Sequence, residues 1–256
     1  MYPQAVELWR QSVFLSERLD PKMLFTPPWR FQRLERFAVQ NTDGLITVSE
    51  ELLDYFVDRY GVEGPTGVVH NVPDLDRLDS MPVEHLGYED EFVISLIGGF
   101  TEQRRLESAI EAMPKILESI PEAKLLLVDD GHDNYVTRLR ELSEELGVND
   151  SVEFTGWVDF ERIRSYYEAS DVTLVLYRSA QAAEFALPNK LFQAMAFGTP
   201  IVGNDLTSLR RILNETEAGI TFSHESGLAD TIIRLFENDE DLRNISDNGR
   251  KAIEDS

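Results

Sequence analysis

The sequence predicts an α/β protein whose larger part is a doubly wound, parallel sheet with helices on both faces. Short runs that are apolar throughout recur beyond residue 90, and longer segments with helical periodicity separate them. Strands without an alternating polar face are typical of parallel sheets buried between two helical layers. The chain has 256 residues, of which 42% are hydrophobic, and this is enough for a core of that kind.

Five strands and at least two amphipathic helices are expected in this larger part. The strands are FVISLI (92–97), KLLLV (124–128), VEFTG (152–156), VTLVLY (172–177) and PIVG (200–203). A first apolar stripe, at the three- and four-residue steps of one helix face, consists of Leu106, Ile110, Met113, Leu117 and Ile120. A second stripe consists of Val136, Leu139, Leu142 and Leu146, and it stops at Gly147, as a helix C-terminus should.

Residues 1–75 have a different pattern. Helices are expected at VELWRQSVFLSERL (6–19), FQRLERFAVQ (31–40) and EELLDYFVDRY (50–60), and strands at GLITVS (44–49) and TGVVHNV (66–72). Two clear strands are fewer than an independent sheet normally contains. The segment 73–90 has two prolines, a glycine and many acids and is predicted to be a linker. We therefore expect one domain over 1–75 and a second over 76–256.

Composition excludes several classes of function. The net charge of −23 disfavours partners such as nucleic acid, because the field of the protein repels phosphate polymers. The absence of cysteine excludes disulfides and thiolate chemistry, and the four histidines lack the spacing of metal ligands, so we expect no metal site. Neither a signal peptide nor a membrane-spanning apolar run is present, which predicts a cytoplasmic protein. An acidic chain with only five lysines also suggests a halophilic cytoplasm, the alternative being an ordinary soluble acidic protein.

A first candidate site follows the strand that ends at Ile97. Gly98 and Gly99 come next and would let the backbone approach a ligand, and a helix is expected to begin near Glu102. Arg104 would then lie in the first helical turn, where a cation opposes the helix dipole by about 0.3–1 kcal/mol. A bound diphosphate would explain a cation at this position. A pair of glycines after a strand also serves any tight turn, so this signal alone is weak.

A second candidate site repeats this pattern in EFALPNKLFQAMAFGTPIV (184–202). Pro188 suits the first position of a helix, which places Asn189 and Lys190 in its first turn. Two cations at two helix N-termini, each after a strand of one sheet, are best explained by one shared anion. The alternative for Lys190 is a solvated surface side chain.

The motifs GGFTEQRRLESAIEAMPKI, AKLLLVDDGH, FTGWV and LPNKLFQAMAFGTPIV occur in the order found in family 4 glycosyltransferases, which this chain resembles from about Asp43 to its end. The resemblance implies a GT-B-like fold, in which two Rossmann-like domains face each other. It places Gly98, Gly99, Arg104 and Lys190 against the diphosphate of a nucleotide-sugar donor. It places Gly156 and Trp157 at the nucleobase, Gln193 at the ribose, and Leu187, Pro188 and Asn189 in the same donor motif. The catalytic residues implied are Arg104, Lys190 and Glu184, the last of which faces the donor sugar.

The resemblance implies transfer of a sugar from a nucleoside diphosphate donor to a glycan or lipid-linked acceptor, with retention of configuration and without a cofactor. The expected enzyme is cytoplasmic and can lie at the inner membrane face. It makes residues 1–75 a truncated acceptor-side domain that a partner chain could complete. Three features depart from the pattern: Gln193 replaces an acid, Asp129 stands where a glycine is usual, and Glu184 is one residue further from position 193. A non-catalytic or split nucleotide-sugar-binding subunit is the alternative function, and an epimerase lacks matching residues. For Trp157, packing beside its loop is the alternative to stacking on a base.

Overall fold

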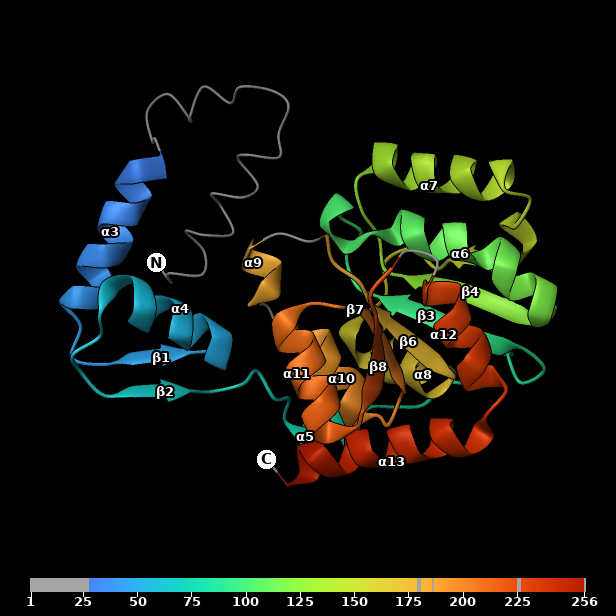
Figure 1. The fold of residues 1–256 in the computed structure, drawn as a ribbon. Helices are drawn as coiled ribbons and strands as arrows, with labels where there is room; N and C mark the ends of the chain where they lie inside the picture. Colours follow the sequence, from blue (N-terminus) through green and yellow to red (C-terminus); the bar gives the residue numbers. More distant parts are fainter. Residues whose placement is uncertain (1–27, 179–180, 186, 225–226, 256) are drawn as a thin grey trace. The chain divides into compact units, whose positions relative to one another are not determined.

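The structure is a computed structural model that describes residues 28–178, 181–185, 187–224 and 227–255. The helix expected over 6–19 lies outside these residues. The described residues form two compact units, coloured along the sequence in Figure 1. Unit 1 comprises those up to His70 together with Ser179–Leu187, and unit 2 comprises Asn71–Arg178 and Pro188–Ser256. None of the helices in the described part of the chain is long and apolar enough to cross a membrane.

The described part of unit 2 contains a parallel sheet of six strands in the order β5-β4-β3-β6-β7-β8. Its strands are β3 (Phe92–Ile97), β4 (Ala123–Val128), β5 (Val152–Phe154), β6 (Val172–Val175), β7 (Ile201–Asn204) and β8 (Gly219–Phe222). The five expected strands are confirmed. The sequence analysis missed β8, because this edge strand is short and only its last residue is buried.

Helices cover both faces of this sheet, as the doubly wound prediction requires. On one face lie α6 (Leu106–Ser119), α7 (Asp133–Glu145) and α12 (Gly227–Phe236), which form the main apolar core with the sheet. The crossover helices of the other face are α8 (Ile163–Glu168), α10 (Asn189–Ala196) and α11 (Thr207–Thr216). The helix α13 (Asp239–Glu254) packs against α10 and α11 and crosses the lower edge of unit 2 in Figure 1.

The connection between β3 and α6 differs from the expectation. A helix was expected to begin near Glu102, but residues Glu102–Arg104 form a separate 3₁₀ turn, η1. Arg105 follows in the left-handed conformation (φ 49°), and the α-helix begins only at Leu106. A left-handed residue interrupts the helical hydrogen-bond ladder. Arg104 therefore precedes the helix and does not lie in its first turn.

Unit 1 has its own small apolar core. Its elements are α3 (Pro28–Gln40), β1 (Leu45–Thr47), α4 (Glu50–Tyr60), β2 (Thr66–Val68) and α9 (Gln181–Glu184). The two strands pair in parallel, and the buried residues Val39, Leu45, Leu52, Phe56 and Tyr60 pack together. The Ser49 hydroxyl accepts the N–H of Leu52 at the start of α4 and donates to the Phe185 carbonyl at 2.8 Å. That residues 1–75 belong to an acceptor-side domain stays a prediction.

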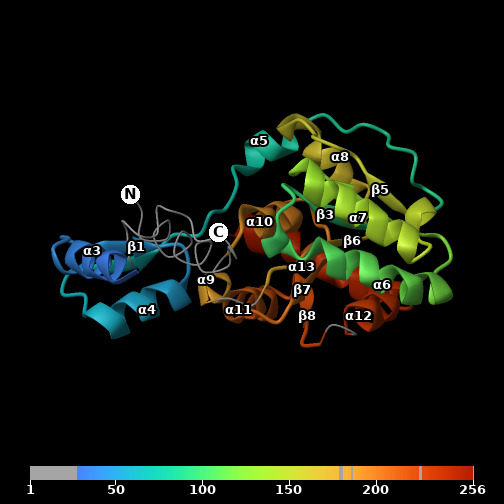
Figure 2. The ribbon, with the colours of Figure 1, turned by 90° about the horizontal axis from the view of Figure 1, so that it is seen from above.

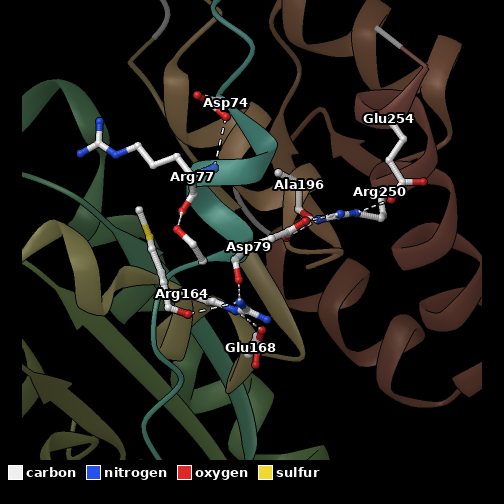
Figure 3. A network of polar contacts seen from close by, with 10 residues as sticks. Asp74, Arg77, Asp79, Arg164, Glu168, Ala196, Arg250 and Glu254 are labelled. Atoms are coloured by element: carbon white, nitrogen blue, oxygen red, sulfur yellow. Dashed lines mark hydrogen bonds and ion pairs between the residues drawn. The ribbon is translucent and has the colours of Figure 1, made fainter.

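The expected linker is an ordered part of unit 2. It contains α5 (Leu75–Asp79). The carboxylate of Asp79, at the end of this helix, accepts two hydrogen bonds from the Arg250 guanidinium of α13, at 2.9 and 2.8 Å (Figure 3). Arg250 also donates to the Ala196 carbonyl at 2.7 Å, so that one side chain ties α5 and α10 to α13. Figure 2 shows the rest of the segment passing along unit 2 by α8 and β5, where Glu84 pairs with Arg162 and Tyr88 donates to Glu153.

Candidate functional site

A pocket of about 240 Å³ opens in unit 2 where β3 and β4 end. Its lining consists of Ile97, Gly98, Val128, Asp129, Trp157, Val158, Phe160, Ile163, Lys190 and Gln193. The strand order reverses at β3, because β4 follows it on one side and β6 lies on the other. Open α/β sheets bind their ligands at such a switch point, at the carboxyl ends of the strands. Four of the predicted site residues, Gly98, Trp157, Lys190 and Gln193, therefore line one cavity.

Gly98 supports the side chain of Lys190. The glycine is buried and has a φ of +111°, and a methyl group placed on it would lie 1.6 Å from Lys190 Cε and 2.1 Å from Nζ. Its N–H donates to the Val128 carbonyl at 2.7 Å, which holds this backbone against β4. A glycine is required here both by the backbone conformation and by the contact with the lysine.

Lys190 is the second residue of α10 and lies in its first turn, as expected. Burial lowers the pKa of the ammonium group, and the nearby positive charge of Arg104 lowers this pKa further, while the carboxylate of Asp129 raises it. A desolvated cation at a helix N-terminus, beside a second cation, is electrostatically unfavourable without an anion. The side chain is half-buried and lies over Gly98 at the pocket, which disfavours the surface-lysine alternative.

Arg104 is almost fully buried, with 6% of its surface exposed. Its Nη2 donates to the Ile97 carbonyl at 2.9 Å, but Nε and Nη1 make no hydrogen bond to any residue that the structure describes. Leaving such charged donors unpaired costs at least about 1–3 kcal/mol each. The arginine does not itself line the pocket; it lies next to Ile97 and Lys190, which do.

Tyr167 of α8 supports the backbone of Lys190. Its hydroxyl donates to the Lys190 carbonyl at 3.4 Å, and its ring stacks on Phe197. Burial raises the pKa of this hydroxyl, and the positive charge of Arg104 lowers it. The sequence analysis missed Tyr167, because a tyrosine in an apolar helix face gives no signal that separates packing from support of a site.

The loop after β5 forms the other wall of the pocket. Gly156 has a φ of +70° and forms a bridge with Asp129. Trp157 is 69% exposed and lines the pocket, which disfavours a packing role beside the loop. Phe160 lines the same wall, and the guanidinium of Arg77 lies 5.1 Å from the centre of its ring. An exposed indole at the rim can stack on a planar ligand.

Other predicted residues lie elsewhere. Gly99 and Asn189 are exposed, and neither they nor half-buried Pro188 line the pocket. Leu187, which is buried, and Glu184, at the end of α9, belong to unit 1. Among the residues that the structure describes, no group of His, Cys, Asp or Glu side chains could hold a metal ion.

A family model described as "Glycosyl transferases group 1" matches residues 79–252, which is more than half of the chain. The N-acetyl-alpha-D-glucosaminyl L-malate synthase of Bacillus anthracis is 26% identical over 86% of this chain and 57% of its own length. The phosphatidyl-myo-inositol mannosyltransferase of Mycobacterium leprae is 29% identical over 82% of this chain and 54% of its own length. The chain thus spans about half the length of these curated relatives.

Solved structures show the same fold. The structure of HepE from Anabaena in complex with UDP has a TM-score of 0.78 and 17% identity, and the match covers 99% of this chain and 72% of that one. WaaG, a glycosyltransferase involved in lipopolysaccharide biosynthesis, has a TM-score of 0.73 and 15% identity over 97% of this chain and 68% of its own. The expected GT-B-like α/β class with a parallel sheet is therefore confirmed.

Proposed function

The chain belongs to the glycosyl transferases of group 1, and from this premise we propose that its pocket binds the diphosphate of a nucleotide-sugar donor. One observation carries the proposal. The buried guanidinium of Arg104 has two nitrogens without a partner among the described residues, and the ammonium group of Lys190 lies close by over Gly98. Diphosphate oxygens in the pocket would accept hydrogen bonds from Lys190 and would balance the positive charges of both side chains.

The proposed chemistry is transfer of the sugar to an acceptor hydroxyl. The bond between the anomeric carbon and the diphosphate oxygen breaks, and the leaving oxygen takes the electron pair. The acceptor oxygen forms the new bond, and its proton passes to an oxygen of the leaving diphosphate. Negative charge grows on the diphosphate as the old bond breaks, and Arg104 and Lys190 would stabilise it. These two residues therefore act on the reacting group through fixed positive charges that need no rearrangement during the reaction.

We assign the remaining donor contacts from the geometry of the pocket and from the resemblance. Trp157 lines the wall of the pocket after β5, and Gly156 precedes it and forms a bridge with Asp129; both would border the nucleobase. Gln193 lines the pocket one turn after Lys190 and can offer its amide to a ribose hydroxyl. The roles of Glu184 at the donor sugar and of Leu187, Pro188, Asn189 and Gly99 near the diphosphate rest on the resemblance alone.

The acceptor class and the stereochemistry are also proposals. A mannosyltransferase that acts on phosphatidyl-myo-inositol and a glucosaminyl L-malate synthase are among the relatives, and the solved relatives include HepE with UDP and with UDP-glucose. The HepE complexes support a nucleotide-sugar donor, and the phosphatidyl-myo-inositol mannosyltransferase supports a lipid-linked acceptor, whereas the L-malate synthase has a small-molecule acceptor; a glycan acceptor rests on the resemblance. Retention of configuration rests on the resemblance to family 4 enzymes.

A second candidate function is a nucleotide-sugar-binding subunit that needs a partner chain for catalysis. It is suggested by the sheet of unit 1, which has two strands in the described part of the chain. The two functions differ in turnover. A complete enzyme releases nucleoside diphosphate from its donor when acceptor is supplied, whereas a binding subunit does so only after a partner chain has been added.

Calorimetric titration with UDP and GDP tests the donor site. Removing the Lys190 ammonium with Lys190→Ala is expected to weaken nucleotide binding about 10- to 100-fold, as the loss of a charged hydrogen bond would. Lys251→Ala is the control, because Lys251 is an exposed lysine of α13 and does not line the pocket. Equal affinities of wild type and Lys190→Ala would contradict the proposed site.

A further inference from the structure

Asp129 has an unusual backbone conformation on the wall of the pocket. Three residues other than glycine have a positive φ in the described part of the chain, and Asp129, at 112°, lies furthest from the left-handed helical region. Arg105 and Glu217, at 49° and 53°, lie within or at the edge of that region. A non-glycine residue in such a conformation is strained, and strain of this kind persists only where the surrounding structure imposes it.

The neighbours of Asp129 hold it in place. Its N–H donates to the Thr155 hydroxyl at 3.3 Å, and its backbone forms a bridge with Gly156. Its Oδ1 accepts the N–H of Asp130 at 2.9 Å, which fixes the carboxylate relative to the end of β4. The strain therefore places one negative charge at a defined position on the wall of the pocket.

This charge faces the cations of the site. Among the described residues that line the pocket, Asp129 is the only acid and Lys190 is the only base. The carboxylate of Asp129 raises the pKa of the Lys190 ammonium. Because the two groups form no ion pair within 4.0 Å, the donors of Lys190 stay available to a ligand. Asp129 thus offsets the repulsion between Arg104 and Lys190 in the empty pocket without occupying either side chain.

The same carboxylate repels a bound diphosphate, and it repels the product more than the donor. In a nucleotide sugar both phosphates are esterified, whereas the released nucleoside diphosphate ends in a phosphate that ionises a second time with a pKa of about 6. The product therefore carries one more negative charge than the donor at neutral pH. A fixed negative charge weakens the binding of the more negative ligand more strongly.

We propose that Asp129 is a specificity-determining residue that lowers the affinity of the pocket for the released nucleoside diphosphate relative to the nucleotide-sugar donor, and so promotes product release. The inference rests on the proposed function, because it needs the diphosphate to lie between the carboxylate and the two cations. It assigns a role to a carboxylate in a site that otherwise attracts anions.

The test compares UDP, UDP-glucose and inorganic pyrophosphate by calorimetric titration of the whole chain. Asp129→Asn removes the negative charge. It keeps the size of the side chain and leaves the backbone conformation of residue 129 unchanged. It is expected to tighten UDP about tenfold and UDP-glucose about threefold, and to tighten pyrophosphate at least as much as UDP. Asp130→Asn is the control, because Asp130 is the exposed neighbour that does not line the pocket, and its affinities should stay within about twofold of wild type.

Asp129→Gly separates the charge from the strain. This variant is expected to match the affinities of Asp129→Asn and, unlike it, to melt at a higher temperature than wild type. Unchanged or weaker UDP binding by both variants, with a wild type that binds UDP, overturns the role of Asp129 and leaves the proposed function intact. A wild type that binds neither nucleotide nor pyrophosphate overturns the proposed function itself.

Discussion

The Cε atom of Lys190 lies 1.6 Å from the point that a side chain on Gly98 would occupy. The glycine after β3 and the lysine of α10 therefore determine each other: the backbone conformation of the first leaves a space that the second fills. This contact fixes the ammonium group at the end of the sheet, next to the guanidinium of Arg104. The site consequently depends on a residue without a side chain as much as on the two charged ones.

The substitution Gly98→Ala is expected to displace Lys190 and to destabilise the fold. The new methyl group would overlap Lys190 Cε, and alanine at a φ of +111° is strained by about 1–3 kcal/mol. Urea denaturation should show a lower free energy of unfolding, and UDP titration a loss of affinity. Gly67→Ala is the control, since nothing lies within 4 Å of a side chain there, its φ is not positive and it does not line the pocket. Similar results for both variants would contradict the role of Gly98.

The substitution Arg104→Met is expected to separate binding from stability. It removes a buried charge with two unpaired nitrogens, so the free energy of unfolding should change by no more than about 1–2 kcal/mol in either direction. UDP affinity should fall about 10- to 100-fold, because a buried positive charge close to the diphosphate is lost. Arg105→Met, at the next residue, is the control and should leave the affinity for UDP within about threefold of wild type. A large loss of stability with unchanged UDP binding would identify Arg104 as a structural residue only.

The pH dependence of binding should follow the Lys190 ammonium. Burial and the charge of Arg104 lower its pKa from the usual 10.5. Below the lowered pKa, Lys190 is charged in both states, and its charge is less favourable in the folded protein than in the solvated, unfolded chain. The free energy of unfolding therefore increases as the pH rises from the folded pKa to 10.5. Lys190→Met should therefore stabilise the apo protein at pH 7, with a gain that shrinks as the pH approaches 10.5. UDP affinity of the wild type should fall as the pH rises through the lowered pKa, and a flat profile would contradict this.

The contact between Asp79 and Arg250 should stabilise unit 2 in a pH-dependent manner. The guanidinium of Arg250 holds the pKa of the Asp79 carboxyl below its usual 3.8, so the stabilisation is present above that pH and is lost as the pH falls through the lower, folded pKa. Both side chains are partly exposed, and Arg250→Ala should cost about 1 kcal/mol or less at pH 7. Denaturation of wild type and variant should converge in acid. Arg234→Ala, at an exposed arginine of α12, is the control.

The halophilic hypothesis predicts that salt stabilises this protein. At a net charge of −23, the carboxylates on the surface repel one another. Salt screens this repulsion, because raising the ionic strength from about 0.1 to 1 M shortens the screening length from about 10 to 3 Å. The melting temperature should rise in molar KCl. A melting temperature that does not change with KCl would favour the ordinary acidic protein that is the alternative.

Much of the fold could be predicted because burial on both faces of a parallel sheet requires apolar runs, and these are local features of the sequence. The runs at 92–97 and 124–128 became β3 and β4 for this reason. The same reasoning failed at β8, because an edge strand with three half-exposed residues need not be apolar throughout. It also misplaced the start of α6, since the left-handed conformation of Arg105 has no signature in residue type.

The sequence alone determined that two cations follow two strands of one sheet, because the ends of apolar strands are readable from residue type. Only the tertiary structure decided that Arg104 is buried with unpaired nitrogens, that Lys190 rests on Gly98, and that Asp129, whose backbone is strained, lines the same pocket as Lys190. These relations join residues that are far apart in the chain. They depend on how β3, β4 and α10 pack, and packing is a property of the assembled sheet that no single stretch of sequence contains.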